Sequence, residues 1–245
     1  MRDLQGKRYW LVGASEGLGR ALAHRMSQAG VELILSARNA DRLQALADEL
    51  PNHAQVVAMD VADTASVRAA AAKIGAIDGV VYLAGLYWPM SAHDWDADKV
   101  EAMCDVNLTG CARVLGQVVP AMAAADRGHI VITGSLAGFR GLPGSIGYGA
   151  SKAGTMGLAE TLYADLRGSG VAVQLVNPGF IKTRLTSQNT FQMPFIMDPD
   201  AAAQRMFHHM RTDRFKLSFP TGFSLLFRLG QFLPDWAWYR IFPRR

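Results

Sequence analysis

The feature that most constrains the fold is an alternation of short apolar runs with segments of helical periodicity, which continues from the first residues to about Asn177. The runs are partly β-branched and short enough to be buried strands. Strands and helices that alternate in this way predict repeated βαβ units around a parallel sheet. The predicted strands are residues 8–12, 32–36, 55–59, 79–84, 130–133 and 171–176.

The first segments between these strands carry helix signals. Apolar residues recur at helical spacing over 18–26, and Gly30 stands where the last residue of a helix takes a positive φ. Asn39 or Asp41 can cap the next helix. A chain of 245 residues with no repeat, low-complexity segment or linker fits one α/β domain better than two. We expect a single domain over 1–245, with a dinucleotide-binding and catalytic part at 1–185 and a substrate lid and tail at 186–245.

Cysteine usage and the N-terminus bear on location. Cys104 and Cys111 show no CxxC pattern and no histidine cluster, so we expect reduced core thiols and no metal site. The first thirteen residues pass from charged residues into a strand and lack the apolar segment of a signal peptide. These observations predict a cytoplasmic protein.

The excess of positive charge lies in the last part of the chain. Residues 205–245 hold eight of the 25 basic residues and only two of the 21 acidic ones, whereas the chain as a whole has a net charge of +4. A solvated basic surface is the ordinary explanation, and an anionic partner is the alternative. No nucleic-acid-binding module is recognisable, so we expect no nucleic-acid partner.

A glycine-rich turn follows the first predicted strand. Its sequence, Gly13-Ala-Ser-Glu-Gly17-Leu-Gly19, opens a helix, so backbone can approach a pyrophosphate at the positive end of the helix dipole. No Lys-Ser/Thr pair follows the last glycine, which argues against a triphosphate-binding loop. The turn therefore predicts dinucleotide binding.

The end of the second strand suggests which dinucleotide binds. The sequence there is Leu35-Ser-Ala37-Arg38, with no carboxylate to hold the ribose 2′-hydroxyl of NAD. Arg38 offers a planar, permanently charged fork to a 2′-phosphate, although an exposed arginine is the simpler reading. We expect NADP(H) to be preferred over NAD(H).

Tyr148 and Lys152 stand four residues apart, on one face of a predicted helix. A neighbouring ammonium group favours phenolate, so we expect Lys152 to lower the pKa of Tyr148 and let it act as acid or base. The histidines offer no Ser-His-Asp alternative, because none has a nucleophile-elbow context.

The order and spacing of these motifs resemble the short-chain dehydrogenase/reductase family, in its branch of about 250 residues. Over roughly residues 5–185 the resemblance rests on the glycine turn, Asp60, Ala84-Gly85, Asn107, Ser135, Tyr148-Gly-Ala-Ser-Lys152 and Asn177-Pro178-Gly179. The family implies a single Rossmann domain with about seven parallel strands between helices. It also implies an NAD(P)-dependent oxidoreductase that acts on CH–OH groups, and a homodimer or homotetramer.

The resemblance also implies residue roles. Tyr148 would be the general acid in reduction and the base in oxidation, Ser135 would hold the substrate carbonyl, and Lys152 would bind the nicotinamide ribose. Asn107 would hold a water that links Lys152 to solvent. The implied cofactor-binding residues are Gly13, Ser15, Glu16, Gly17, Leu18, Gly19, Arg38, Asp60, Val61, Ala84, Gly85, Tyr148, Lys152, Pro178, Gly179, Ile181 and Thr183.

Two segments depart from the family pattern. Tyr82-Leu-Ala-Gly85 stands where the family usually has Asn-Asn-Ala-Gly, whose first asparagine ties neighbouring strands together. The usual final strand ending in Asp-Gly-Gly is replaced by Lys216-Leu-Ser-Phe-Pro220 and an aromatic, arginine-containing tail.

The segments expected around the substrate are apolar: residues 86–90, Phe139, 142–143 and 191–197. They suggest a lipophilic ketone or alcohol, such as a 3-keto acyl or ketosphinganine-like lipid, and the alternative is that they simply pack the lid and core. Residues 223–245 are too often interrupted for a membrane span but could lie on a membrane surface, close the site or form a subunit interface. Similar tails occur in bacterial relatives that resemble ketosphinganine reductases. The alternative function is a sensor or scaffold that binds NADP(H) without turnover.

Overall fold

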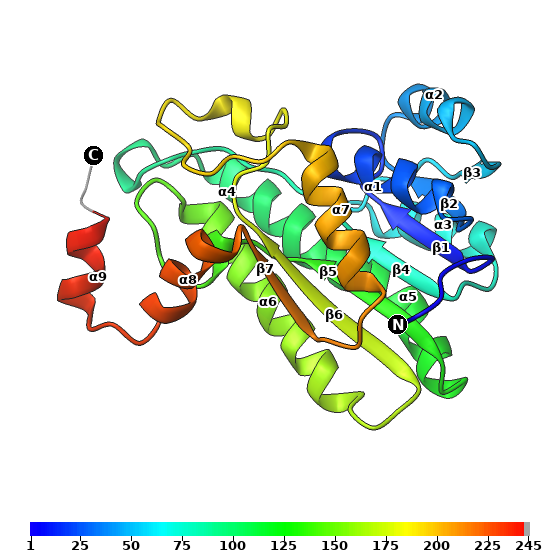
Figure 1. Cartoon of the computed structure of the whole chain (residues 1–245). Helices are drawn as coiled ribbons and strands as arrows, with labels where there is room; N and C mark the ends of the chain where they lie inside the picture. The colour runs from blue at the N-terminus through cyan, green and yellow to red at the C-terminus, as the bar shows by residue number, and fades with distance from the viewer. Residues whose placement is uncertain (243–245) are drawn as a thin grey trace.

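The computed structural model describes residues 1–242. Its centre is one seven-stranded sheet in the order β3-β2-β1-β4-β5-β6-β7, in which every neighbouring pair is parallel (Figure 1). This confirms the predicted Rossmann-like α/β fold. The strands are β1 (Arg8–Val12), β2 (Glu32–Ser36), β3 (Ala54–Val56), β4 (Gly79–Tyr82), β5 (Gly128–Thr133), β6 (Val171–Pro178) and β7 (Lys216–Phe219).

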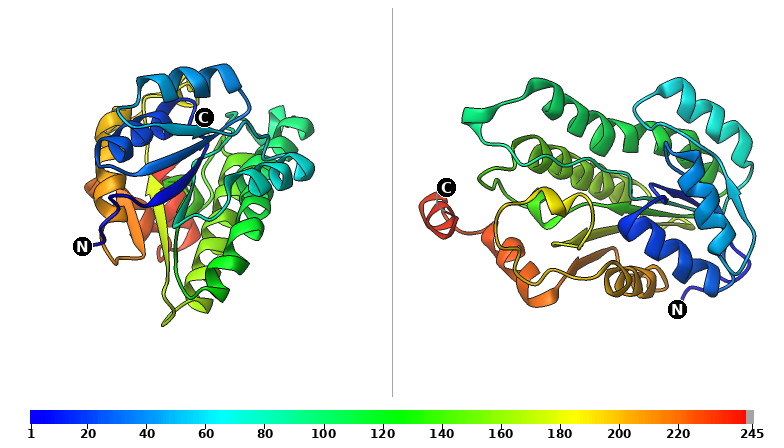
Figure 2. Two further views of the ribbon diagram at one scale, coloured as in Figure 1. Left: turned by 90° about the vertical axis from the view of Figure 1, so that its right-hand side faces the viewer. Right: turned by 90° about the horizontal axis from the view of Figure 1, so that it is seen from above.

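Helices cover both faces of the sheet, as the left view of Figure 2 shows. Alternate strand residues point to opposite faces, so Tyr9 and Leu11 join one core cluster while Trp10 and Val12 join the other. The first cluster contains α1, α2 and α7, and the second contains α3, α5 and α6. The helices are α1 (Gly17–Gln28), α2 (Ala40–Glu49), α3 (Thr64–Ile74), α4 (Ala97–Cys104), α5 (Gly110–Ala124), α6 (Ile146–Asp165), α7 (Pro199–Met210), α8 (Thr221–Gly230) and α9 (Asp235–Ile241).

The strand order reverses between β1 and β4, which are neighbours in the centre of the sheet. In open parallel sheets, ligands bind beyond the carboxyl ends of the strands at such a reversal. The segments that follow β1, β2, β4, β5 and β6 all begin at this one edge. The sheet therefore brings together the motifs that the sequence analysis found after successive strands.

Several local predictions can be compared with the structure. Gly30 has a φ of +76°, and the Asn39 side chain accepts from the Arg42 backbone N–H at 2.8 Å, so Asn39 and not Asp41 caps α2. The strand predicted at 55–59 is shorter, Ala54–Val56, and the one predicted at 79–84 ends at Tyr82. The departing segment Lys216–Phe219 forms β7, which pairs with β6 and completes the sheet.

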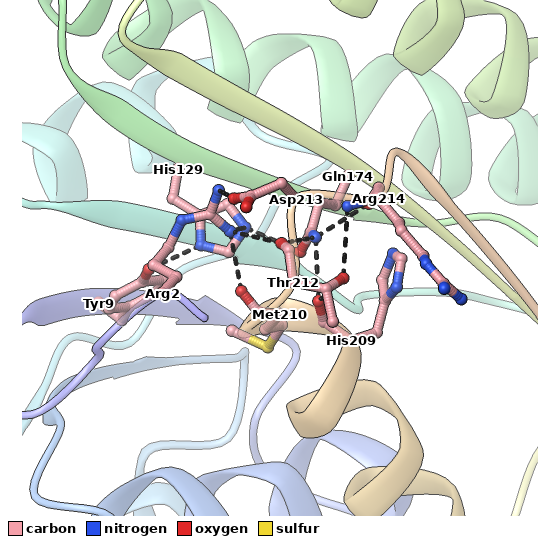
Figure 3. Close-up of polar contacts among 9 residues, drawn as sticks. All are labelled: Arg2, Tyr9, His129, Gln174, His209, Met210, Thr212, Asp213 and Arg214. Atoms are coloured by element: carbon pink, nitrogen blue, oxygen red, sulfur yellow. Dashed lines mark hydrogen bonds and ion pairs between the residues drawn. The ribbon is translucent and has the colours of Figure 1, made fainter.

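A buried polar network lies near the amino ends of the strands, opposite the carboxyl ends (Figure 3). The Tyr9 hydroxyl lies 2.7 Å from Nδ1 of His129, and Nε2 of His129 lies 2.9 Å from Oε1 of Gln174. Arg2 reaches in from the N-terminal segment and donates to the carbonyls of Met210 and Thr212. The network joins the N-terminal segment, β1, β5, β6 and the end of α7. It lies away from the carboxyl ends of the strands.

Neither cysteine forms a disulfide. Cys111 is buried in the core, as predicted, whereas Cys104 is only partly buried. Among residues 1–242 there is no group of side chains suited to a metal ion, and none of their helices combines the length and the apolar character that a bilayer span requires. Arg244 and Arg245, part of the predicted basic tail, lie outside the described residues.

Candidate active site

A cavity of about 2350 Å³ opens at the carboxyl edge of the sheet. Every residue predicted for catalysis or cofactor binding lines it, with the exception of Asn107. One end is formed by the glycine turn, the end of β2 and residues 59–61, and the other by apolar segments and the tail. The predicted catalytic residues Ser135, Tyr148 and Lys152 line the same cavity.

The glycine turn forms a cradle whose backbone packs too closely against neighbouring backbone to admit a side chain at Gly13 or Gly19. Gly13 has a φ of +93°, and a Cβ placed on it would stand 2.4 Å from the Ala84 nitrogen. A Cβ on Gly19 would stand 2.1 Å from the Gly13 carbonyl oxygen. The N-terminus of α1 has no side-chain cap, so its first N–H groups face the turn free for an anion. The residues present therefore fit the pyrophosphate of a dinucleotide.

Three arginines surround the outer side of this turn. Arg38 is exposed and lines the cavity, as do Arg42 and Arg184, which the sequence analysis did not identify. Nε and Nη2 of Arg184 lie 3.0 and 2.6 Å from Oε1 of Glu16, and Arg42 lies 3.1 Å from Oε2 of the same carboxylate. The hydrogen bond from Arg184 lowers the pKa of Glu16. Glu16 thus holds two arginines beside the position where Arg38 meets the cavity.

Ser135, Tyr148 and Lys152 come together from β5 and α6. Ser135 caps the short turn after β5, where its hydroxyl accepts from the Ala137 N–H at 3.1 Å. The Lys152 ammonium group is buried, donates to the Thr133 carbonyl at 2.9 Å and lies 5.9 Å from the centre of the Tyr148 ring. A phenol, a hydroxyl and an ammonium group therefore face one space.

The pKa of Tyr148 moves in the direction opposite to the sequence prediction. Burial raises it, and the hydrogen bond with Ser135 offsets part of the rise. The ammonium group of Lys152 bonds to a backbone carbonyl and not to the phenol, which explains why it does not lower the pKa of Tyr148 as predicted. Burial lowers the pKa of Lys152 to about 8.

Asn107 lies behind the cavity, in a π-helical turn (Asp105–Thr109) between α4 and α5. Its Nδ2 donates to the Leu86 carbonyl and to Oγ of Ser151, each at 2.9 Å, and its Oδ1 accepts from the Leu86 N–H at 2.7 Å. Thr155 donates to its backbone carbonyl at 2.9 Å. Asn107 thus joins the loop after β4 to α6, which carries Tyr148 and Lys152.

Tyr82 occupies the position of the asparagine that the family usually has after β4. Its side chain is buried, and its hydroxyl donates to the Val106 carbonyl at 2.5 Å. A Cβ on Gly110 would stand 2.9 Å from this hydroxyl, so the small residue there makes room for it. Tyr82 therefore ties β4 to the π-helical turn that holds Asn107.

The second half of the cavity is mainly apolar, although polar residues such as His93, Asp94 and Gln192 also line it. Most of the predicted substrate segments line it, but Trp88, Phe139 and residues 195–197 do not. Phe139 packs against the core, and Phe195 is exposed. The tail, for which closing the site was one of the predicted alternatives, adds further apolar residues. The apolar lining includes Leu86, Tyr87, Pro89, Met90, Leu142, Pro143, Phe191, Met193, Pro194, Phe223, Phe227, Tyr239, Ile241 and Phe242.

The tail is fastened to the body by Arg140 and Trp238. Arg140 donates to the carbonyls of Gly230 and Leu233 at 2.6 and 2.5 Å and pairs with Asp235. The fully buried Trp238 donates to the Gly141 carbonyl at 2.9 Å, and the Arg140 guanidinium lies 5.3 Å from the centre of its ring. Helices α8 and α9 are thereby held beside the apolar half of the cavity, at the far left of Figure 1.

Comparison with known proteins gives a consistent result. The family model described as short chain dehydrogenase matches residues 7–193. An uncharacterized oxidoreductase of Myxococcus xanthus is 37% identical over 242 residues, which cover 96% of each chain. A 3-oxoacyl-acyl-carrier-protein reductase of Thermotoga maritima is 34% identical over 197 residues, 76% of this chain and 78% of that one.

Solved structures agree with the sequence comparisons. A short-chain dehydrogenase from Sphingobium yanoikuyae, in complex with NADPH, superposes with a TM-score of 0.83 at 25% identity and covers 91% of each chain. The matched family model spans more than half of this chain and includes the glycine turn, Ser135, Tyr148 and Lys152. The chain therefore belongs to the short-chain dehydrogenase/reductase family of NAD(P)-dependent oxidoreductases, which act on CH–OH groups.

Proposed function

We propose that this protein is an NADP(H)-dependent reductase of a lipophilic ketone, such as a 3-keto acyl or ketosphinganine-like lipid. The observation that carries the proposal is the single cavity in which Tyr148 stands between a glycine cradle and an apolar compartment. In this proposal the protein is a single domain. Residues 1–185 bind the cofactor and carry out catalysis, and residues 186–245 cover the substrate.

The dinucleotide supplies the hydride when bound. Gly13, Ser15, Glu16, Gly17, Leu18 and Gly19 would hold its phosphates, Asp60 and Val61 its adenine, and Ala84, Gly85, Pro178, Gly179, Ile181 and Thr183 its nicotinamide half. Each of these residues lines the cavity.

The residues around Tyr148 divide the proton chemistry. Ser135 holds the substrate carbonyl oxygen, and Tyr148 donates a proton to that oxygen in reduction and takes it back in oxidation. A phenol with a raised pKa keeps its proton at neutral pH, which suits the donor role. Lys152 would hold the nicotinamide ribose, and a water at Asn107 would connect Lys152 to solvent for proton resupply.

A screen of NADPH oxidation over carbonyls of increasing chain length tests the substrate. We expect turnover to rise from short polar ketones to long-chain 3-keto lipids, because the apolar lining favours burial of the chain. Preference for small polar carbonyls would overturn the lipophilic assignment. Tight NADPH binding with no turnover on any carbonyl would favour the sensor alternative.

Arg38 carries the proposed preference for NADP(H). Its exposed guanidinium at the end of β2 can meet a 2′-phosphate directly. Replacement of Arg38 by Ala should weaken NADPH binding about tenfold or more and leave NADH binding within about twofold, because one charge-assisted bond is worth ~1.5–3 kcal/mol. Equal effects on the two cofactors would contradict the assignment.

The outer face of α8 and α9 is unusually apolar for a surface. Leu229, Phe232 and Trp236 are 62%, 85% and 72% exposed, and Arg228 and Arg240 are exposed beside them. Aromatic and aliphatic residues interleaved with arginine are typical of helices that lie on anionic membranes. We propose that the protein acts in the cytoplasm as a homodimer or homotetramer and contacts the membrane surface through this face.

Co-sedimentation with vesicles tests this contact. Wild type should pellet with vesicles that contain anionic lipid and less with neutral vesicles, and Phe232→Ser with Trp236→Ser should stay in solution. A wild type indifferent to vesicles, whose apolar face is instead buried between subunits, would overturn the membrane contact.

A further inference from the structure

A loop that lines the cavity, predicted above as a substrate lid, has a closed base. Residues 182–197 leave the end of β6 and return to α7, and they appear yellow at the top of Figure 1. The Lys182 N–H donates to the Met197 carbonyl and the Met197 N–H to the Phe180 carbonyl, each at 2.9 Å. Because its two ends are held together, the position of this lid depends on the contacts that its middle part makes.

The middle part of the lid is bonded to Tyr87, in the loop after β4. The Tyr87 hydroxyl donates to Oδ1 of Asn189 at 2.6 Å. The side chain of Gln188 donates to the Tyr87 carbonyl at 2.9 Å. These two bonds connect segments about a hundred residues apart, across the cavity that both of them line.

The ring of Tyr87 also contacts the predicted proton donor. Its centre lies 4.9 Å from that of Tyr148, with the planes at 73°, which is an edge-to-face contact. Burial raises the pKa of Tyr87 to about 12, so its hydroxyl remains a neutral donor to Asn189 at neutral pH. One side chain therefore touches the lid with its hydroxyl and Tyr148 with its ring.

We propose that Tyr87 is a positioning residue that latches the lid over the substrate through Asn189 and fixes the orientation of the Tyr148 ring. The role of Tyr87 in catalysis rests on the proposed function, in which Tyr148 donates the proton. The hydroxyl sets how firmly a bound substrate is covered, and the ring sets the placement of the proton donor. These two tasks can be separated by substitution, because Tyr87→Phe removes only the hydroxyl.

The first test measures hydrogen exchange of the lid amides, residues 186–193, in the protein with NADPH. Tyr87→Phe and Asn189→Ala should each speed this exchange several-fold, and the double variant should exchange no faster than the faster single one, because both remove the same bond. Tyr163→Phe, a surface tyrosine on α6, serves as the matched control. Unchanged exchange in Tyr87→Phe, or additive effects of the two substitutions, would overturn the latch.

The second test separates KM from kcat with a long-chain ketone that wild type reduces. Tyr87→Phe should raise KM about 2- to 10-fold with kcat nearly unchanged, since one hydrogen bond is worth ~0.5–1.5 kcal/mol. Tyr87→Ala should lower kcat as well, because the ring contact is also lost. Equal kinetics of Phe and Ala variants would overturn the ring's role. If wild type reduces no lipophilic ketone while the lid exchange behaves as described, the proposed substrate fails and the latch stands.

Discussion

Gln174 satisfies an unusual number of backbone groups for one side chain. Its Nε2 lies 3.0, 2.9 and 3.0 Å from the carbonyl oxygens of His209, Thr212 and Arg214, which lie at the end of α7 and in the turn before β7. Its Oε1 receives the Nε2–H of His129. Gln174 therefore ties the helix end and the turn to the sheet, together with Arg2, which donates to the carbonyls of Met210 and Thr212.

Replacement of Gln174 by Ala should lower the free energy of unfolding by about 1–3 kcal/mol, because the Arg214 carbonyl loses the donor and the buried His129 loses the acceptor that Gln174 provides. Urea unfolding measures this, with the exposed Gln44→Ala on α2 as control and an expected change within ~0.5 kcal/mol. Equal midpoints and slopes for the two variants would show that the network contributes nothing to stability.

His129 makes stability depend on pH. Burial lowers its pKa from 6.5 to about 3, and the nearby Arg2 acts in the same direction. Between those pH values the unfolded chain binds a proton that the folded chain excludes, so this contribution to stability is present above pH 6.5 and is lost as the pH falls toward 3. Each pH unit costs up to about 1.4 kcal/mol for one proton.

Unfolding free energies at pH 7, 6, 5 and 4 test this for wild type and His129→Gln, whose amide can still donate and accept. The variant should show a shallower loss of stability below pH 6.5. Parallel curves for the two proteins would contradict the assignment to His129.

At the residue scale, Tyr148 shows that its position could be predicted from the sequence and the direction of its pKa shift could not. The four-residue spacing of Tyr148 and Lys152 correctly places both side chains at one cavity. The direction of the pKa shift depends on burial and on the carbonyl of Thr133, which competes for the ammonium group, and neither is visible in the spacing.

At the scale of elements, periodicity predicted strands β1 and β2 to the residue, because their buried runs end sharply at turns. It overextended β3, where the chain turns away after Val56 and only single backbone bonds continue from Val57 and Met59. The sequence could not choose among the predicted roles of the tail, since the docking of α8 and α9 depends on contacts such as Arg140 with Gly230 that are remote in sequence.

Gly230 tests that docking directly. A Cβ there would stand 2.2 Å from the buried ring of Trp238, whereas Gly222, in the same helix, has open space. Gly230→Ala should displace α9 from the cavity and raise the KM for a long-chain ketone, while Gly222→Ala should retain wild-type kinetics. Tryptophan emission of Gly230→Ala should shift to the red as Trp238 meets water. An unshifted emission in that variant would contradict the docking.

At the scale of the whole molecule, the parallel sheet explains why the sequence located so much of the site. Motifs after β1, β2, β4, β5 and β6 must meet at one edge, so their order along the chain was enough to gather them. Arg42 and Arg184 were missed because a loop or helix residue reaches this edge only through tertiary packing, and Tyr87 was predicted only as a member of the apolar segment 86–90. The same edge places the Tyr148 phenol in one cavity with the glycine turn and the mainly apolar segments.

The most direct test of this account compares NADPH oxidation by wild type and Tyr148→Phe on a carbonyl that wild type reduces, with Tyr163→Phe as control. Loss of the proton donor should lower kcat by at least about a hundredfold. NADPH affinity should stay within about twofold, because the cradle is intact. A Tyr148→Phe variant that reduces the carbonyl at the wild-type rate would contradict the central claim that Tyr148 transfers the proton.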